Sequence, residues 1–376
     1  MLAATPAAAS PYVPASDDVV LERLPDGIDP SLRQLKVLRA GLKSHPENLD
    51  LATRLARRAI EAARETGDPR FLGQAQAALA LWWVQADPPP AALLLRATIK
   101  QSLHDFSGAL GDLDKLIAAR PADGQALLTR ATVLGVRGRY AEARADCARI
   151  ARAVPRLVAL ACDAGPASLS GESGRSYAAL ADELRSGGAG SGVREWALTL
   201  AGEIAQRRAD AENAETHFRA ALALDARDPY LQAAYADFLL EQGRPAEVVA
   251  RLRDSTRNDS LLLRLALAEA RLPGMRAAGD MHRADLAERF DAARRRGDVL
   301  HRREEARYRL ELAGDVREAL RLAKDNWNVQ RESADLRILV AAARAQGDAA
   351  TLAQAEAWVR SHHLEDATVL GLLGMR

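Results

Sequence analysis

Aromatic residues are scarce in this chain of 376 residues. Phe, Trp and Tyr together make up 4% of the sequence, although 48% of its residues are apolar. The apolar content is therefore carried mainly by Ala and Leu, which favour helices, while β-branched residues are few. Such side chains fit helices that approach one another closely, and they fit a sandwich or a barrel poorly. We therefore expect an all-α protein.

An excess of charge of one sign is also missing. The chain has 52 basic and 51 acidic residues, for a formal net charge of +1, so it offers no overall field that would attract nucleic acid or an anionic membrane. Because no run of 18 or more apolar residues occurs, we expect no membrane span. The expected partners are proteins, and the sequence leaves the oligomeric state open.

Sequence motifs of catalysis and metal binding are absent as well. The seven histidines form no His-Glu-x-x-His pair, and neither a Cys-x-x-Cys, a phosphate-binding loop nor a nucleophile elbow occurs. The glycine-rich run at 185–192 follows no predicted strand and contains no lysine, so we interpret it as a linker. We expect no cofactor, no metal and no enzymatic activity.

Internal repetition is the strongest signal that is present. Residues 91–121, 124–155 and 195–226 each contain an apolar helical stretch, a short break and a second helical stretch with a small residue early in it. Pro121 and Pro155 close two successive units 34 residues apart. Carried along the chain, this register predicts units that begin near 90, 124, 157, 195, 229, 262, 300 and 333.

Small residues recur where the two helices of a unit are expected to cross. The unit that begins at 195 has Gly202, Ala214 and Ala221 at these positions, with the bulky Phe218 beside them. The pattern resembles that of the tetratricopeptide repeat family. The resemblance implies a superhelical solenoid of helix-turn-helix repeats, with about eight to nine units and a C-terminal capping helix.

The interruptions of the repeat predict how the chain is divided. We expect a disordered or extended segment over 1–28, diverged helical repeats over 29–89, tetratricopeptide-like repeats over 90–184, a Gly/Ser-rich linker over 185–193, further such repeats over 194–271, diverged C-terminal repeats over 272–362 and a capping helix over 363–376.

The first residues are rich in Ala, Pro and Ser and lack the charged and apolar regions of a signal peptide. They fit a disordered cytosolic tail. They also fit the start of a mature exported protein in which Met1 replaces the signal peptide, and this second interpretation is favoured.

The two cysteines occupy matching positions in a predicted helical hairpin. Cys147 and Cys162 each lie 7.5 residues from the centre of the turn between Val154 and Pro155, so they lie at the same height on two antiparallel helices. A disulfide and a pair of buried thiols both fit this geometry. A disulfide indicates an oxidising compartment and so supports export.

The resemblance to tetratricopeptide proteins also implies a function. In that family the first helix of each unit lines a concave groove, which implies a non-enzymatic scaffold that binds a partner protein. We expect this scaffold to belong to an exported, periplasmic bacterial assembly, and the alternative is a cytosolic adaptor that binds a peptide or helical segment. The groove residues implied by the register are Leu94, Thr98, Gln101, Leu128, Thr132, Trp196, Glu203, Tyr230, Asp237 and Tyr308.

Overall fold

The computed structural model describes residues 16, 30–298 and 301–375, and within these residues every regular element is a helix. The predicted N-terminal segment 1–28 therefore lies almost entirely outside the described residues. The helices are α1 Pro30–Ser44, α2 Leu49–Thr66, α3 Arg70–Ala78, α4 Ala80–Trp83, α5 Pro90–Ser102, α6 Phe106–Ala119, α7 Gly124–Val136, α8 Tyr140–Ile150, α9 Arg156–Ser168, α10 Ser173–Ser186, α11 Ser191–Arg207, α12 Ala211–Leu224, α13 Pro229–Glu241, α14 Pro245–Leu252, α15 Asp259–Ala270, the short 3-10 turn η1 Pro273–Met275, α16 Arg276–Arg295, α17 Arg302–Glu311, α18 Val316–Trp327, α19 Ser333–Gln346, α20 Ala349–His362 and α21 Ala367–Leu373.

Consecutive helices pack in pairs, and each pair packs on the next. From α5 to α20 the chain forms eight such hairpins. The first helix of each hairpin carries an odd number, and these helices, from α5 to α19, follow one another along the inner side. The short α21 packs against α19 and ends the array. The predicted all-α solenoid with a terminal helix is confirmed.

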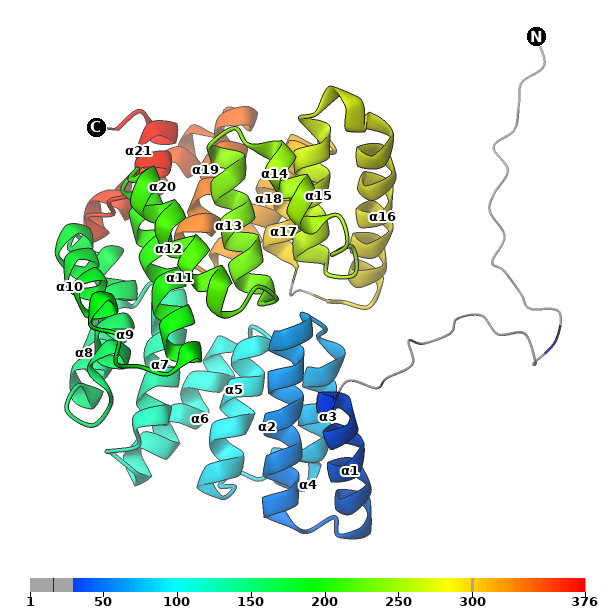
Figure 1. Cartoon of the computed structure of the whole chain (residues 1–376), viewed down its shortest axis with the longest axis vertical. Helices are drawn as coiled ribbons and strands as arrows, with labels where there is room; N and C mark the ends of the chain where they lie inside the picture. The colour runs from blue at the N-terminus through cyan, green and yellow to red at the C-terminus, as the bar shows by residue number, and fades with distance from the viewer. Residues whose placement is uncertain (1–15, 17–29, 299–300, 376) are drawn as a thin grey trace.

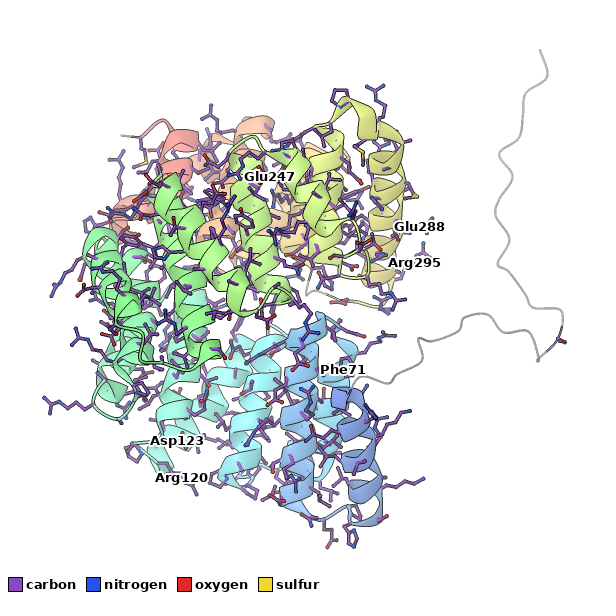
Figure 2. The ribbon with its side chains drawn as sticks, viewed as in Figure 1. Phe71, Arg120, Asp123, Glu247, Glu288 and Arg295 are labelled. Carbon is purple, nitrogen blue, oxygen red and sulfur yellow. A yellow bond between two sulfur atoms is a disulfide. The ribbon has the colours of Figure 1, made fainter. Side chains whose placement is uncertain are left out.

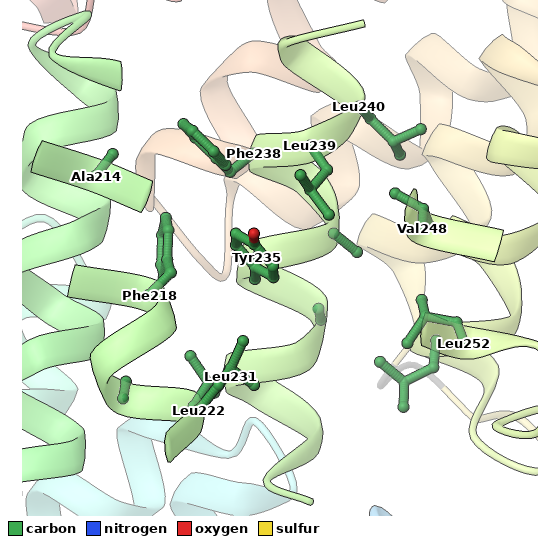
Figure 3. Close-up of a cluster of buried hydrophobic side chains, with 14 of the residues drawn as sticks. Ala214, Phe218, Leu222, Leu231, Tyr235, Phe238, Leu239, Leu240, Val248 and Leu252 are labelled. Carbon is green, nitrogen blue, oxygen red and sulfur yellow. The ribbon is translucent and has the colours of Figure 1, made fainter. Parts of the chain in front are cut away.

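Small side chains allow the two helices of a hairpin to cross closely. A Cβ atom on Gly202 of α11 would lie only 2.9 Å from the Phe218 ring of α12. Ala214 and Ala221 of α12 are fully buried on either side of this ring. Figure 3 shows how Phe218 continues into the core between α12, α13 and α14 through Tyr235. The small-residue pattern in the sequence therefore marks the helix crossings.

The turns inside most of the hairpins contain one residue in the left-handed backbone region. His104, Gly138, Ala209 and Gly243 all have a positive φ, and each of the pairs His104–Gly138 and Ala209–Gly243 is separated by one 34-residue period. Glycine adopts this conformation without strain, whereas histidine and alanine do so at a cost. The position is thus set by the fold of the turn even where the residue type varies.

A buried ion pair recurs with the same period. The guanidinium of Arg96 on α5 donates two hydrogen bonds to the carboxylate of Asp112 on α6, at 2.7 and 2.9 Å. The guanidinium of Arg130 on α7 binds Asp146 on α8 in the same two-pronged way, at 2.7 Å for both bonds. Each pair spans one hairpin. A rotation of one helix against the other would separate the two charges and leave a buried charge without a partner. Each ion pair therefore fixes how its two helices are rotated against each other.

The array winds far enough to meet itself (Figure 1). Helices α1–α6 fill one half of the molecule, and the C-terminal helices α17–α21 return to lie beside the middle of the chain. At the end of α2, Gly67 lies against the side chain of Asn258, which caps α15. Because distant repeats touch, the inner side of the superhelix encloses space instead of forming an open groove.

The structure shortens the predicted interruptions. Helix α10 ends at Ser186 and α11 begins at Ser191, so the connection comprises residues 187–190 and not the whole of 185–193. Residues 272–280 also contain glycine and proline, and most of this stretch lies in η1 and in the first turns of α16. In both cases the packing of its apolar positions already holds the helix in place. Polar and small residues at its end therefore continue the helix.

The connection 187–190 gives a first testable expectation. Its amides form no hydrogen bond to a described backbone carbonyl, whereas those of the following turns of α11 do. Amide hydrogen exchange should therefore be nearly unprotected at 187–190 and slow from the second turn of α11 onward. Mass spectrometry with peptides that overlap this segment measures the difference. Uniform protection across 183–195 would contradict it.

Candidate functional site

A cavity of about 690 Å³ lies inside the superhelix. It is lined by the inner helices α7, α9, α11 and α13 and by the first turns of α17 and α19. A second cavity of about 380 Å³ adjoins it and shares Asp237, Arg303 and Arg337 in its lining. Ligand-binding cavities in proteins commonly have volumes of about 300–1,000 Å³, so the larger cavity has the size of a binding site.

The walls of the larger cavity differ in chemistry. Helices α7 and α9 contribute mostly apolar or small side chains, among them Leu128, Val136 and Leu169. Helices α11 and α13 contribute carboxylates and aromatic rings, including Trp196 and Tyr230. A ligand in this cavity therefore meets an apolar wall on one side and an acidic, aromatic wall on the other.

A contact between distant repeats closes the superhelix around the cavity. The amide of Arg331 donates a hydrogen bond to the carbonyl of Val136 at 2.8 Å. The guanidinium of Arg137 donates to the carbonyl of Val329 at 2.9 Å, and the hydroxyl of Tyr140 donates to the carbonyl of Arg331 at 3.2 Å. We call this the closing contact, defined by residues 136–140 on one side and by residues 327–331 with Trp358 on the other.

Gly138 lies at the centre of the closing contact. Its φ is +73°, and an added Cβ would lie 2.5 Å from Cη2 of Trp358. The indole ring of Trp358 stacks on His362 at 3.8 Å between ring centroids and meets Tyr140 edge-on at 6.5 Å. Glycine is required here because both the backbone conformation and the indole ring exclude a side chain.

Ion pairs join the walls of the two cavities. Asp237 on α13 binds Arg264 on α15 and Arg307 on α17, each at 2.6 Å. Burial by itself raises the pKa of Asp237, but the two guanidinium groups outweigh it and lower this pKa to about 2. Arg303 on α17 binds Glu332 and, at 2.5 Å, Asp335 at the start of α19. These pairs hold α13, α15, α17 and α19 in fixed positions around the cavity.

Glu203 and Tyr230 form a hydrogen-bonded pair inside the cavity. The Tyr230 hydroxyl donates to Oε1 of Glu203 at 2.5 Å. Burial raises the pKa of Glu203, and the charge of Arg207 offsets this only in part. The negative charge of Glu203 holds the pKa of Tyr230 well above its ordinary value. The hydroxyl of Tyr230 therefore stays protonated and donates this hydrogen bond.

The structure brings six of the ten predicted groove residues together in the lining of the larger cavity. Leu94, Thr98 and Gln101 are partly exposed on α5 but line neither cavity. The six that line it are Leu128, Thr132, Trp196, Glu203, Tyr230 and Asp237.

The tenth predicted residue, Tyr308, lies elsewhere and requires a correction. It is 4% exposed, its ring packs on Phe290 of α16, and its hydroxyl donates to the carbonyl of Arg283 at 3.2 Å. Helix α17 begins at Arg302, and Arg303 and Arg307, four residues apart, line the cavities from this helix. Tyr308 follows Arg307 and is turned by about 100° from it, toward α16.

Several cavity residues were missed by sequence analysis. Among them, Arg303 and Glu332 line the larger cavity, although the repeat register assigns neither of them to the groove. The missed signal for Arg303 is its i, i+4 spacing with Arg307 on one helix face. Glu332 lies in the connection before α19, and only the winding of the array brings it to the cavity.

Cys147 on α8 and Cys162 on α9 are joined in a disulfide, with their Cα atoms 5.6 Å apart. Both residues are buried, and Cys162 also lines the larger cavity. The bond links the helix that follows Gly138 to the next inner helix. It therefore stabilises the cavity wall directly behind the closing contact.

Two further kinds of site are absent from the part of the chain that the structure describes. No three His, Cys, Asp or Glu side chains there lie close enough together to hold a metal ion. No helix there is long and apolar enough to cross a membrane.

Comparison with known proteins adds little to this geometry. No family model matches the chain, and no curated protein sequence matches it. Solved structures do match it, among them a tetratricopeptide repeat protein from Parabacteroides merdae (14% identity, covering 83% of this chain and 92% of that one, TM-score 0.29), the APC/C hetero-tetramer Cut9–Hcn1 (13%, 91% and 84%, TM-score 0.41) and yeast Tom70 (11%, 92% and 91%, TM-score 0.35). The helical hairpins of this chain establish a helical repeat array by themselves, and likenesses this distant carry no argument about its function.

Proposed function

We propose that the protein is a non-enzymatic scaffold that binds an extended segment of a partner protein in the larger cavity of its superhelix. The observation that carries the proposal is aromatic surface left open inside a cavity of about 690 Å³. Trp196 is 37% exposed and Tyr230 is 59% exposed, whereas most large apolar side chains of this chain are buried. Exposed aromatic surface in a concave site is typical of a place where a ligand packs.

The side chains of the cavities favour binding over catalysis. Neither cavity lining contains a histidine, and the only cysteine among the described lining residues is held in the disulfide. Asp237, whose pKa is lowered to about 2, is neutralised by two arginines and is not free to move a proton.

The proposal includes the compartment. We place the scaffold in an exported, periplasmic bacterial assembly, and the buried disulfide supports this because disulfides persist in oxidising compartments. A cytosolic adaptor that binds a peptide or a helical segment is the alternative, and the thiol measurement described in the Discussion distinguishes the two.

Peptide display on the immobilised full chain tests the binding function. Decapeptides enriched on the wild-type protein should bind the Leu128→Arg variant at least about tenfold more weakly. Leu128 is half-buried on the apolar wall, so the longer arginine extends into the cavity and takes the space of the ligand without disturbing the core.

The matched control makes the same substitution outside the cavity. Leu224 is 42% exposed at the end of α12, and Leu224→Arg should change peptide affinity by no more than about twofold. Circular dichroism and thermal unfolding verify that both variants are folded. Equal binding by the wild type and Leu128→Arg contradicts the assignment of the cavity, and failure to enrich any peptide contradicts the proposed function.

A further inference from the structure

The charged groups of the larger cavity fall into two sets. Asp237 is bound by two arginines, and Glu332 is bound by Arg303. By contrast, among the described residues no lysine or arginine forms an ion pair with Glu195 or Glu203. Glu195 accepts a hydrogen bond from the hydroxyl of Thr199 at 3.0 Å, and Glu203 accepts one from the hydroxyl of Tyr230.

The nearby cations leave these two carboxylates unneutralised. Arg207 and Arg303 both lower the pKa of Glu203. However, Nη2 of Arg207 donates to Ser168, and Arg303 is bound to Glu332 and Asp335. Arg64 of α2 lines the same cavity from the opposite end of the chain. On the acidic side, Asp228 also lines the cavity and raises the pKa of Glu195.

The pKa values of both carboxyl groups agree with this arrangement. Burial raises the pKa of Glu195, and the charges of nearby aspartates raise it further. Burial also raises the pKa of Glu203. The pKa of a carboxyl group rises when the group is partly desolvated and forms no ion pair, and a cation bound beside it lowers this pKa again.

Each of the two carboxylates has an aromatic neighbour, one through the sequence and one through a hydrogen bond. Trp196 follows Glu195 on α11, and Tyr230 on α13 is hydrogen-bonded to Glu203. Both rings are open to the cavity, at 37% and 59% exposure. Carboxylates next to exposed rings are suited to a guanidinium or ammonium group, which pairs with the carboxylate and packs on the face of the ring.

We infer that the wall formed by α11 and α13 is a receptor site for an arginine or lysine side chain of the bound partner segment. This inference rests on the proposed function and names the chemistry of the partner. Glu203 and Glu195 supply the negative charge, while Trp196 and Tyr230 supply the ring surface. The apolar wall of α7 and α9 holds the remainder of the segment.

A double-mutant comparison with the displayed decapeptides tests the inference. On the wild-type protein, enriched peptides should share a basic residue at one position, and replacing it by glutamine should weaken binding at least about tenfold. On Glu203→Gln, the same peptide change should weaken binding by no more than about threefold, because the variant has already removed the charge that the basic residue meets. The glutamine has the shape of the glutamate, and its amide oxygen still accepts from Tyr230.

Glu288→Gln is the matched control. Glu288 points outward from α16, away from the cavity (Figure 2), so this variant should retain the full loss seen with the wild type. An equal loss on the wild type and on Glu203→Gln overturns the role of Glu203. Enriched peptides without a shared basic residue overturn the inference while leaving the proposed function intact. A selection that enriches no peptide overturns both.

Discussion

Replacing Gly138 by alanine is expected to lower the free energy of unfolding by about 2–4 kcal/mol and to loosen the closing contact. About 1 kcal/mol of this comes from forcing a residue with a Cβ into the left-handed backbone region that Gly138 occupies, at φ +73°. The rest comes from the clash with Trp358, because the new Cβ would lie 2.5 Å from Cη2 of its ring. Denaturant unfolding measures the loss, and small-angle X-ray scattering should show a larger radius of gyration.

Gly243→Ala separates the two causes. Gly243 occupies the same position of the hairpin formed by α13 and α14, at φ +69°, and an added Cβ there meets no atom within 4 Å. This variant should therefore show only the backbone cost of about 1 kcal/mol and an unchanged radius of gyration. Equal losses for the two variants would show that the contact with Trp358 contributes nothing to stability.

The closing contact also bears on binding. It holds the connection before α19 against the end of α7, and so it positions Glu332 and Arg303 at the edge of the cavity. If Gly138→Ala loosens this contact, peptides selected on the wild-type protein should bind the variant more weakly, although Gly138 lies outside the cavity lining. Gly243→Ala should bind them normally.

Removing the disulfide between Cys147 and Cys162 is expected to cost about 3 kcal/mol, because the bond closes a loop of 15 residues in the unfolded chain. Since each hairpin contacts mainly its neighbours, the loss should be concentrated in α8 and α9. Amide exchange of the Cys147→Ala, Cys162→Ala double variant should rise there and stay unchanged in α12. The wild-type protein treated with a reductant is the matched comparison, because it loses the bond and keeps both sulfur atoms.

The oxidation state also tests the compartment. Thiol titration of the unfolded, unreduced protein isolated from its native compartment should detect no free sulfhydryl. Two free thiols would show that the bond is absent there and would remove its support for an exported scaffold. The cytosolic alternative would then be favoured.

Where the sequence predicted the site well, the prediction depended on local register. Leu128, Trp196 and Tyr230 lie on inner helices whose start is marked by a proline or by a clear repeat, and all three line the cavity. The prediction for Tyr308 was wrong because the unit near 300 follows a longer interval, which makes its start uncertain. A small error in that start assigned the tyrosine to the groove, whereas its side chain lies in the core. On a helix, one residue corresponds to about 100° of rotation.

The recurring ion pairs were visible in principle. Arg96 with Asp112 and Arg130 with Asp146 have the same spacing within their units and lie one period apart. An arginine and an aspartate in an amphipathic repeat are usually solvated, however, and the sequence carries no sign that these two pairs are buried. Their burial follows from the packing of α5 on α6 and of α7 on α8.

The sequence by itself determined the helical hairpins of this protein and the small residues at their crossings, because each depends on contacts within one or two units. Only the tertiary structure decided that the array closes, that Gly138 meets Trp358 and that Glu203 lines a cavity. The physical reason is accumulation. A small rotation is added at every packed hairpin, and its sum over many repeats decides which distant residues meet, although no single repeat encodes it.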